Sequence, residues 1–137
     1  MIYFVDANIF LEVQLGGERS EECKKFLERI YKNKFDAITS DFIIYICLIQ
    51  IQNKSGSSEK MGKFMDFLTN LEALEILRPS TSIISKALRF MENYKLDFND
   101  ALVVASMVEN NIDKLVSFDT DFDKVEEIER IEPKDVI

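Results

Sequence analysis

Apolar and polar positions alternate along the chain in blocks whose periods predict both strands and helices. Residues 2–5 are continuously apolar and stop at Asp6, which predicts a short buried strand. In residues 20–31 the apolar side chains recur every three or four positions, which predicts an amphipathic helix. The same criteria predict further strands over 35–39, 74–77, 115–118 and 127–131, and further helices over 9–15, from 40 or 41 through 51, from 58 through 68, over 81–94 and from 97 through 108.

Small and polar residues mark the expected ends of these elements. Asn8 is a candidate cap for the first helix, and the pair Gly16-Gly17 is a candidate stop. Residues 53–58 are all polar or small and lie between two apolar segments, so we expect a loop there and no domain boundary. The strand ending before Pro133 alternates in polarity, which is typical of a sheet edge.

Strands that are separated by helices favour parallel pairing through right-handed crossovers. We therefore expect an α/β fold, a three-layer α/β/α sandwich around a parallel sheet of about five strands. No repeat or low-complexity linker divides the chain, which predicts a single domain over residues 1–137. Periodicity leaves the order of the strands open.

Composition narrows the chemistry that such a domain can perform. The chain has no histidine, which excludes Ser-His-Asp and Cys-His catalysis and every zinc site that needs an imidazole. A net charge of −8 argues against a broad phosphate-binding surface. Carboxylates must therefore carry any polar chemistry.

The two cysteines and the N-terminal segment indicate a cytoplasmic protein. Cys23 and Cys47 lie in apolar helical patterns and form no CxxC pair, so we expect buried free thiols in a reducing compartment. The residues after Met1 lack the features of a signal peptide, and no apolar run approaches the ~20 residues that cross a bilayer. We expect no membrane association.

Acidic residues follow two of the predicted strands and begin one predicted helix. Asp6 ends the first strand, Asp119 and Asp121 follow the strand at 115–118, and Asp100 lies one turn into its helix. In a parallel sheet these positions converge on the carboxyl edge, where open α/β sheets bind ligands. Taken singly, Asp97, Asp100 and Asp121 also suit helix capping or turns, which need no function. Asp6 has no basic residue near it in sequence, so its burial demands another partner.

Converging carboxylates repel one another at neutral pH unless a cation neutralises them. Ligands that offer only oxygen select a hard ion, Mg²⁺ or Mn²⁺. Such an ion activates water and stabilises charge on phosphate oxygens, so the site suits phosphodiester hydrolysis without histidine.

Three segments together resemble the PIN-domain family: YFVDANIF at the start, LDFNDALVVASMVENN around Asp100, and LVSFDTDFDKVEEIERI at the end. Their order and spacing match the family over nearly the whole chain. The resemblance implies a five-stranded parallel sheet in the order 3-2-1-4-5. It also implies a ribonuclease dependent on Mg²⁺ or Mn²⁺ that cuts single-stranded RNA, often as the toxin of a toxin–antitoxin pair.

The resemblance also assigns roles to residues. Asp6, Asp100 and Asp119 correspond to the catalytic, metal-binding aspartates. Asn8 accompanies the first of them, Ser117 corresponds to a hydroxyl residue that orients the acids, and Asp121 is an auxiliary acid. A homodimer formed through the middle of the chain is implied, as is a possible antitoxin protein that inserts an apolar helix near the site.

One position departs from the family pattern. A glutamate is usual about six residues after a serine like Ser40, and Ile46 stands there. Three carboxylates suffice for one ion, so the leading hypothesis is an active endoribonuclease. The alternative is a PIN scaffold with weakened or lost nuclease activity that binds RNA or protein. A phospho-acceptor or aspartyl phosphatase fits poorly, because Arg78-Pro79 follows the middle strand and Asn8 replaces the required second aspartate.

Overall fold

The computed structural model describes residues 1–137 and contains one parallel sheet of five strands in the order β3-β2-β1-β4-β5. The α/β fold class and the strand order expected from the sequence are thereby confirmed. The strands are β1 (Ile2–Val5), β2 (Asp36–Ser40), β3 (Leu74–Leu77), β4 (Lys114–Val116) and β5 (Glu129–Ile131).

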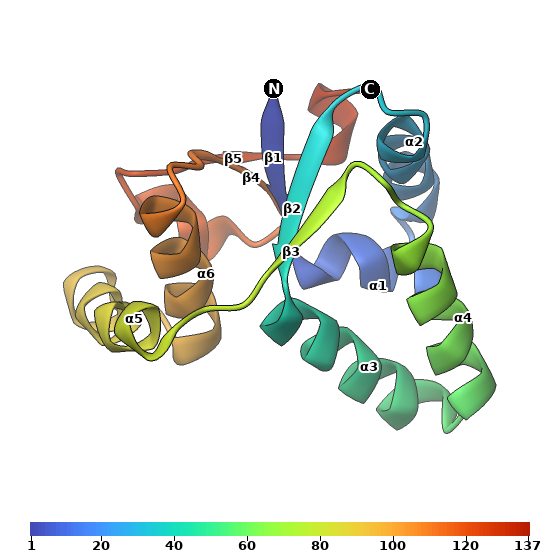
Figure 1. Ribbon diagram of the computed structural model, residues 1–137, viewed down its shortest axis with the longest axis horizontal. Coiled ribbons are helices and arrows are strands. Elements are labelled where there is room, and N and C mark those ends of the chain that lie inside the picture. Colours follow the sequence, from blue (N-terminus) through green and yellow to red (C-terminus); the bar gives the residue numbers. More distant parts are fainter.

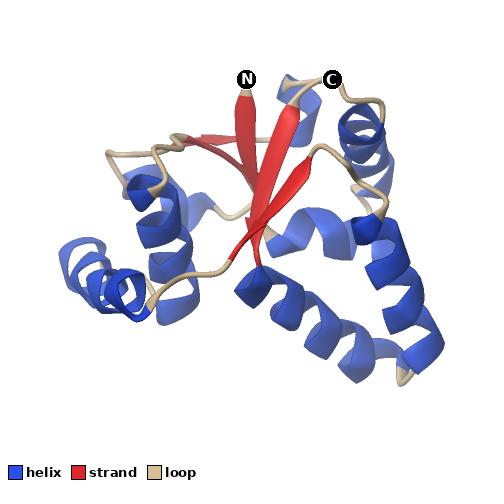
Figure 2. Cartoon of the chain, viewed as in Figure 1, coloured by secondary structure: helices blue, strands red, loops and turns tan.

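Six α-helices flank the sheet (Figures 1 and 2). They are α1 (Ala7–Leu15), α2 (Ser20–Tyr31), α3 (Asp41–Ser55), α4 (Ser58–Thr69), α5 (Thr81–Tyr94) and α6 (Phe98–Glu109), and two short 3₁₀ turns, η1 (Thr120–Lys124) and η2 (Pro133–Asp135), follow β4 and β5. In Figure 1, α1 to α4 are grouped on one side of the central strands, and α5 and α6 pack together on the other. The sheet is thus the middle layer of three.

β1 is central because its side chains are apolar on both faces. Phe4 pairs with Ile38 of β2 and with Leu115 of β4, and Phe4, Val5 and Leu115 are fully buried. Continuous burial of this kind is typical of strands that helices cover on both sides. The chain reverses its direction of winding between β1 and β4, so the carboxyl ends of these two neighbours border the crevice where α/β sheets bind ligands.

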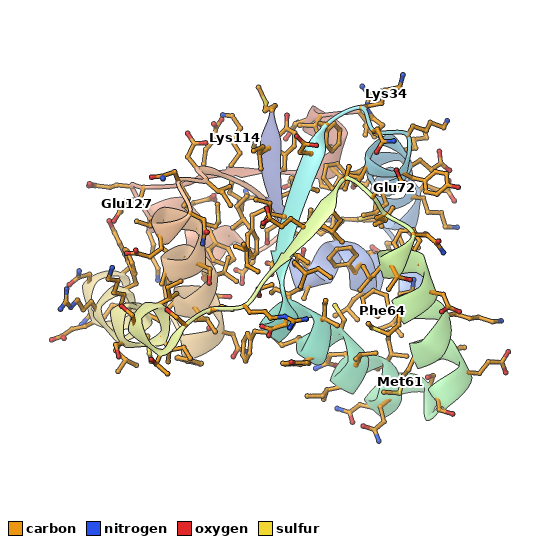
Figure 3. All side chains as sticks on the ribbon, viewed as in Figure 1. Lys34, Met61, Phe64, Glu72, Lys114 and Glu127 are labelled. Carbon is orange, nitrogen blue, oxygen red and sulfur yellow. The ribbon has the colours of Figure 1, made fainter.

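The helices bury aromatic side chains against one another. Phe64 of α4, labelled in Figure 3, meets Phe10 of α1 edge to face, with their ring centroids 5.9 Å apart, and both are buried. Cys23 and Cys47 are buried free thiols, as the sequence predicts. No helix combines the length and the apolar character that crossing a membrane requires.

The structure corrects several expected boundaries. The first helix begins one residue after Asp6, which is its N-cap, whereas Asn8 lies inside it. The polar stretch at 53–58 is mostly helical, because α3 continues to Ser55 and ends at Gly56, whose φ of 62° suits glycine. The last strand is shorter than expected: β5 begins at Glu129, and an unexpected 3₁₀ turn, η1, separates it from β4.

Candidate functional site

Asp6 occupies the junction between β1 and α1, at the carboxyl edge of the central strand. Asp6 is only 8% exposed, and each of its two carboxylate oxygens accepts a hydrogen bond, which compensates for the loss of contact with water. Oδ1 accepts from the Ala7 amide at 2.8 Å, and Oδ2 accepts from the Ser117 hydroxyl at 2.7 Å. Burial raises the pKa of Asp6, and these two hydrogen bonds oppose the rise. Asp6 therefore combines an N-cap role with a fixed orientation toward β4.

Ser117 links the first and last of the three segments that carry the predicted site. Its hydroxyl donates to Asp6 and accepts from the Asp119 amide at 3.0 Å and from Asn8 Nδ2 at 3.2 Å. Asn8 Oδ1 in turn accepts from the Phe118 amide at 3.4 Å. Because Ser117 is fully buried, these bonds hold β1, α1 and the segment after β4 in one arrangement.

Asp119 and Asp121 are positioned by the turn that follows β4. Asp119 caps η1, and its Oδ1 accepts from the Asp121 amide at 2.9 Å. This short loop brings two carboxylates that are two positions apart in sequence toward the same side. Arg19 covers the residue before them, since its guanidinium carbon lies 4.3 Å from the centre of the Phe118 ring.

Asp100 reaches the same place from the other layer. It lies in the first turn of α6, where its backbone amide donates to the N-cap Asp97 at 3.0 Å. Burial, together with the charges of Asp119, Asp97 and Asp6, raises the pKa of Asp100 to about 7. Asp97 itself is exposed and serves the helix cap. A carboxyl group whose pKa is raised by burial and by neighbouring carboxylates indicates a local excess of negative charge, which is typical of functional sites.

The carboxylates of Asp100, Asp119 and Asp121 each offer one oxygen such that all three oxygens lie within 4.8 Å of one another. Asp6 is not a member of this group, although its charge acts on Asp100. A donor set made of carboxylate oxygens alone fits a hard divalent ion such as Mg²⁺ or Mn²⁺. The structure thus brings together Asp100 and Asp119 as expected and adds Asp121 to them, whereas Asp6 lies outside this group and is hydrogen-bonded to Ala7 and Ser117.

A cavity of about 230 Å³ opens beside these carboxylates, between α1, α3 and α6. Asp6, Asn8 and Asp100 line it, and so does Ile46, the residue that stands where the PIN pattern has glutamate. Ile46 is partly buried and presents only carbon. The departure seen in the sequence therefore lies within the site.

Sequence reasoning assigned no role to three residues that the structure places around these acids. Asn99 lines the cavity, and its only signal is its place between Asp97 and Asp100. Gln50 also lines it, one turn of α3 beyond Ile46. Arg130 of β5, 14% exposed, donates to the Ser117 carbonyl at 3.1 Å and pairs with Asp123 of η1 at 2.7 Å, so it braces the loop that bears Asp119 and Asp121.

Comparisons with known proteins agree with this architecture. The family described as PIN domain matches residues 3–128. A relative in Methanocaldococcus jannaschii, named ribonuclease VapC6, is 25% identical, and the alignment covers 93% of this chain and 95% of the relative.

Two solved structures have the same fold. VapC20 of Mycobacterium tuberculosis, described as a toxin that cleaves the sarcin–ricin loop, superposes with a TM-score of 0.74 at 16% identity over 90% of this chain and 95% of that one. VapBC2 of Rickettsia felis, described as bound to a DNA fragment from its promoter, superposes with a TM-score of 0.72 at 21% identity. The superposition covers 96% of this chain and 98% of that one. The family match covers most of the chain and these likenesses accord with it; the chain belongs to the PIN domain family.

Proposed function

We propose that this PIN domain is a divalent-metal-dependent endoribonuclease that hydrolyses phosphodiesters of single-stranded RNA as the toxin of a toxin–antitoxin pair. The observation that carries the proposal is the convergence of Asp100, Asp119 and Asp121 oxygens within 4.8 Å at the carboxyl edge of the sheet. The name of the archaeal relative supports the reaction class. A cytoplasmic setting, which suits two buried free thiols, is part of the proposal.

Mg²⁺ or Mn²⁺ held by these three carboxylates would supply a Lewis acid and the positive charge that draws an RNA phosphate to an acidic protein. The protein's own residues prepare the site for it. Asp119 and Asp121 are fixed by η1, and Ser117 fixes Asp119 relative to Asp6. Because the pKa of Asp100 is raised to about 7, this carboxyl would give up its proton when a divalent cation is bound at neutral pH.

The second candidate function is a PIN scaffold with weakened nuclease activity that binds RNA or a protein. The observation that favours it is Ile46, which lines the cavity beside Asp6 and Asp100 and supplies no ligand. One ion can be held without that residue, whereas a second ion clamping the leaving oxygen would lack a carboxylate on this side. A chain that binds Mn²⁺ and RNA but cleaves none at saturating metal would favour this candidate.

The proposal includes two protein partners. A toxin–antitoxin complex of Klebsiella pneumoniae shares the fold, with a TM-score of 0.71 at 19% identity over 96% of this chain and 97% of that one, which supports an antitoxin. Exposed apolar side chains on α3 and α5, Tyr45, Ile49, Ile84 and Leu88, support a homodimer through these helices. Light scattering that gives a monomer at micromolar concentration would contradict the dimer.

RNA cleavage by matched variants tests the proposed activity. Asp119→Asn removes one carboxylate of the group. A change at Asp6 would also alter the buried N-cap of α1, so Asp119 is the better position for this test. Asp113→Asn is the control, because Asp113 is exposed at the opposite end of β4. With Mn²⁺ and a single-stranded RNA, we expect at least about a hundredfold loss of rate for Asp119→Asn and none for Asp113→Asn. Equal rates for both variants would contradict the proposal.

A further inference from the structure

The cavity beside the carboxylates has a composition that metal binding does not explain. Half of its ten lining residues are hydrophobic, and its volume of about 230 Å³ is below the range of pockets that enclose drug-sized molecules. It adjoins the proposed catalytic group through Asp100, which belongs to its wall together with Asp6. In the proposed ribonuclease, a group in this cavity would therefore lie next to the scissile phosphate.

Its apolar walls come from three helices. Leu11 of α1, Ile43 and Ile46 of α3 and Val103 of α6 present aliphatic side chains to the cavity. Aliphatic walls that approach from different helices suit a flat, largely apolar body whose faces are covered and whose edge stays polar. An unpaired nucleobase of single-stranded RNA is such a body, since proteins read it by covering its faces and hydrogen-bonding its edge. Replacement of a carboxylate by Ile46 makes this wall more apolar.

Three amide side chains line the cavity, and two of them supply its polar edge, because the amide of Asn8 is already hydrogen-bonded to Ser117 and Phe118. Gln50 and Asn99 line the cavity from α3 and α6, and neither amide hydrogen-bonds to another group of the protein. Each amide offers a carbonyl acceptor and an NH₂ donor, which together match the Hoogsteen edge of adenine, where the N6 amino group lies beside the N7 acceptor. Asn and Gln pair in this way with adenine.

The charges around the cavity favour the same base. No lysine or arginine lines it, whereas Asp6 and Asp100 do. On its Hoogsteen edge guanine presents only the acceptors O6 and N7, which proteins bind chiefly with Arg or Lys, and uracil presents the acceptor O4 there. The Hoogsteen edge of adenine carries the N6 amino group, a donor that the carboxylate of Asp100 in the cavity wall attracts.

We propose that this cavity is the pocket for an unpaired adenine next to the bond that is cut, with Gln50 and Asn99 as its specificity-determining residues. The inference rests on the proposed ribonuclease function and assigns it a preferred base.

Nucleoside binding tests the pocket without cleavage. On the Hoogsteen edge, adenosine and inosine differ by one exchange, the amino group for a carbonyl. Each nucleoside is titrated into the intact protein in EDTA while the side-chain amide signals are followed by NMR. We expect the Gln50 and Asn99 signals to shift with adenosine, and inosine to bind roughly tenfold more weakly. Gln50→Leu keeps the apolar bulk and should abolish the difference between the two nucleosides, whereas Gln52→Leu, at an exposed position of the same helix, should preserve it. Equal binding of adenosine and inosine to the wild-type protein would overturn the pocket.

Cleavage separates this inference from the proposed function. Short oligouridylates that carry one adenosine or one inosine are incubated with Mn²⁺, and we expect cuts beside adenosine that lose their position in Gln50→Leu while Mn²⁺ affinity is unchanged. Cleavage without any preference for adenosine, unaltered by Gln50→Leu, would overturn the pocket and leave the nuclease standing. Selective adenosine binding by a protein that cuts no RNA would support the pocket and contradict the nuclease.

Discussion

Replacing Asp100 with asparagine should stabilise the metal-free protein and destabilise the metal-loaded one. The side chain lies among like charges, and its pKa rises from 3.8 to about 7 through burial and the charges of Asp119, Asp97 and Asp6. An acid whose pKa is raised on folding adds stability below its unfolded pKa, and that stability is lost as the pH rises toward the folded pKa. Above pH 7 the native carboxylate is ionised and the full cost applies.

The size of the effect follows from the shift. About three pKa units correspond to about 4 kcal/mol at most, and contact with solvent reduces this figure. Asparagine also gives up the favourable interaction of a carboxylate with the first turn of α6, about 0.5 kcal/mol. We therefore expect the free energy of unfolding of Asp100→Asn to exceed that of the wild type by about 1 to 2 kcal/mol at pH 8 in EDTA. At pH 4 the two proteins should differ little.

Urea unfolding followed by circular dichroism measures this difference in the free energy of unfolding. Asp113→Asn is the control, because Asp113 is exposed. Saturating Mg²⁺ should reverse the order of wild type and Asp100→Asn at pH 8, because an ion at one hundred times its dissociation constant adds about 3 kcal/mol to a protein that binds it. A metal-free Asp100→Asn protein that is less stable than wild type at pH 8, or a difference that does not change with pH, would refute the reasoning.

Two further substitutions test other parts of the site. Ile46→Glu adds a carboxylate to the cavity wall beside Asp6 and Asp100, so it should tighten Mn²⁺ binding by about tenfold, equivalent to about 1.4 kcal/mol. Calorimetry measures the Mn²⁺ affinity, and an unchanged affinity together with an unchanged cleavage rate would contradict the placement of the missing acid at Ile46. Arg130→Met removes the bonds from a largely buried guanidinium to Asp123 and to the Ser117 carbonyl, and should cost about 2 kcal/mol of stability and weaken Mn²⁺ binding. Lys134→Met, which loses a 3.9 Å surface ion pair to Glu132, should change neither quantity, and an equal effect of both substitutions would count against the bracing role of Arg130.

Local patterns predicted most elements because their periods are strong. The amphipathic helix over 20–31 and the strand over 74–77 have the expected bounds, since a wrong period would expose an apolar face. The expected cap at Asn8 was wrong because both Asp6 and Asn8 are good N-caps, and only the end of β1 decides between them. The polar residues of 53–55 continue α3 because a helix can run past its apolar face until a glycine ends it.

The sequence predicted at which edge of the sheet the site lies, but it did not predict which carboxylate oxygens form the site. Parallel strands place Asp6, Asp119 and the start of α6 at one edge whatever the details. Whether Asp121 joins Asp100 depends on η1, a turn that begins with a hydrogen bond from the Asp121 amide to the Asp119 carboxylate. The brace from Arg130 and the cavity between three helices arise from contacts across layers, which periodicity does not encode.

The dependence of RNA cleavage on Mn²⁺ tests the central claim most directly. Protein stripped with EDTA is titrated with Mn²⁺ in the presence of a fluorescent single-stranded RNA, and the initial rate is recorded at each concentration. If Asp100, Asp119 and Asp121 hold one catalytic ion, cleavage is absent in EDTA and rises hyperbolically to a plateau as Mn²⁺ is added. Cleavage that persists in EDTA, or that never appears at saturating Mn²⁺, would contradict the claim.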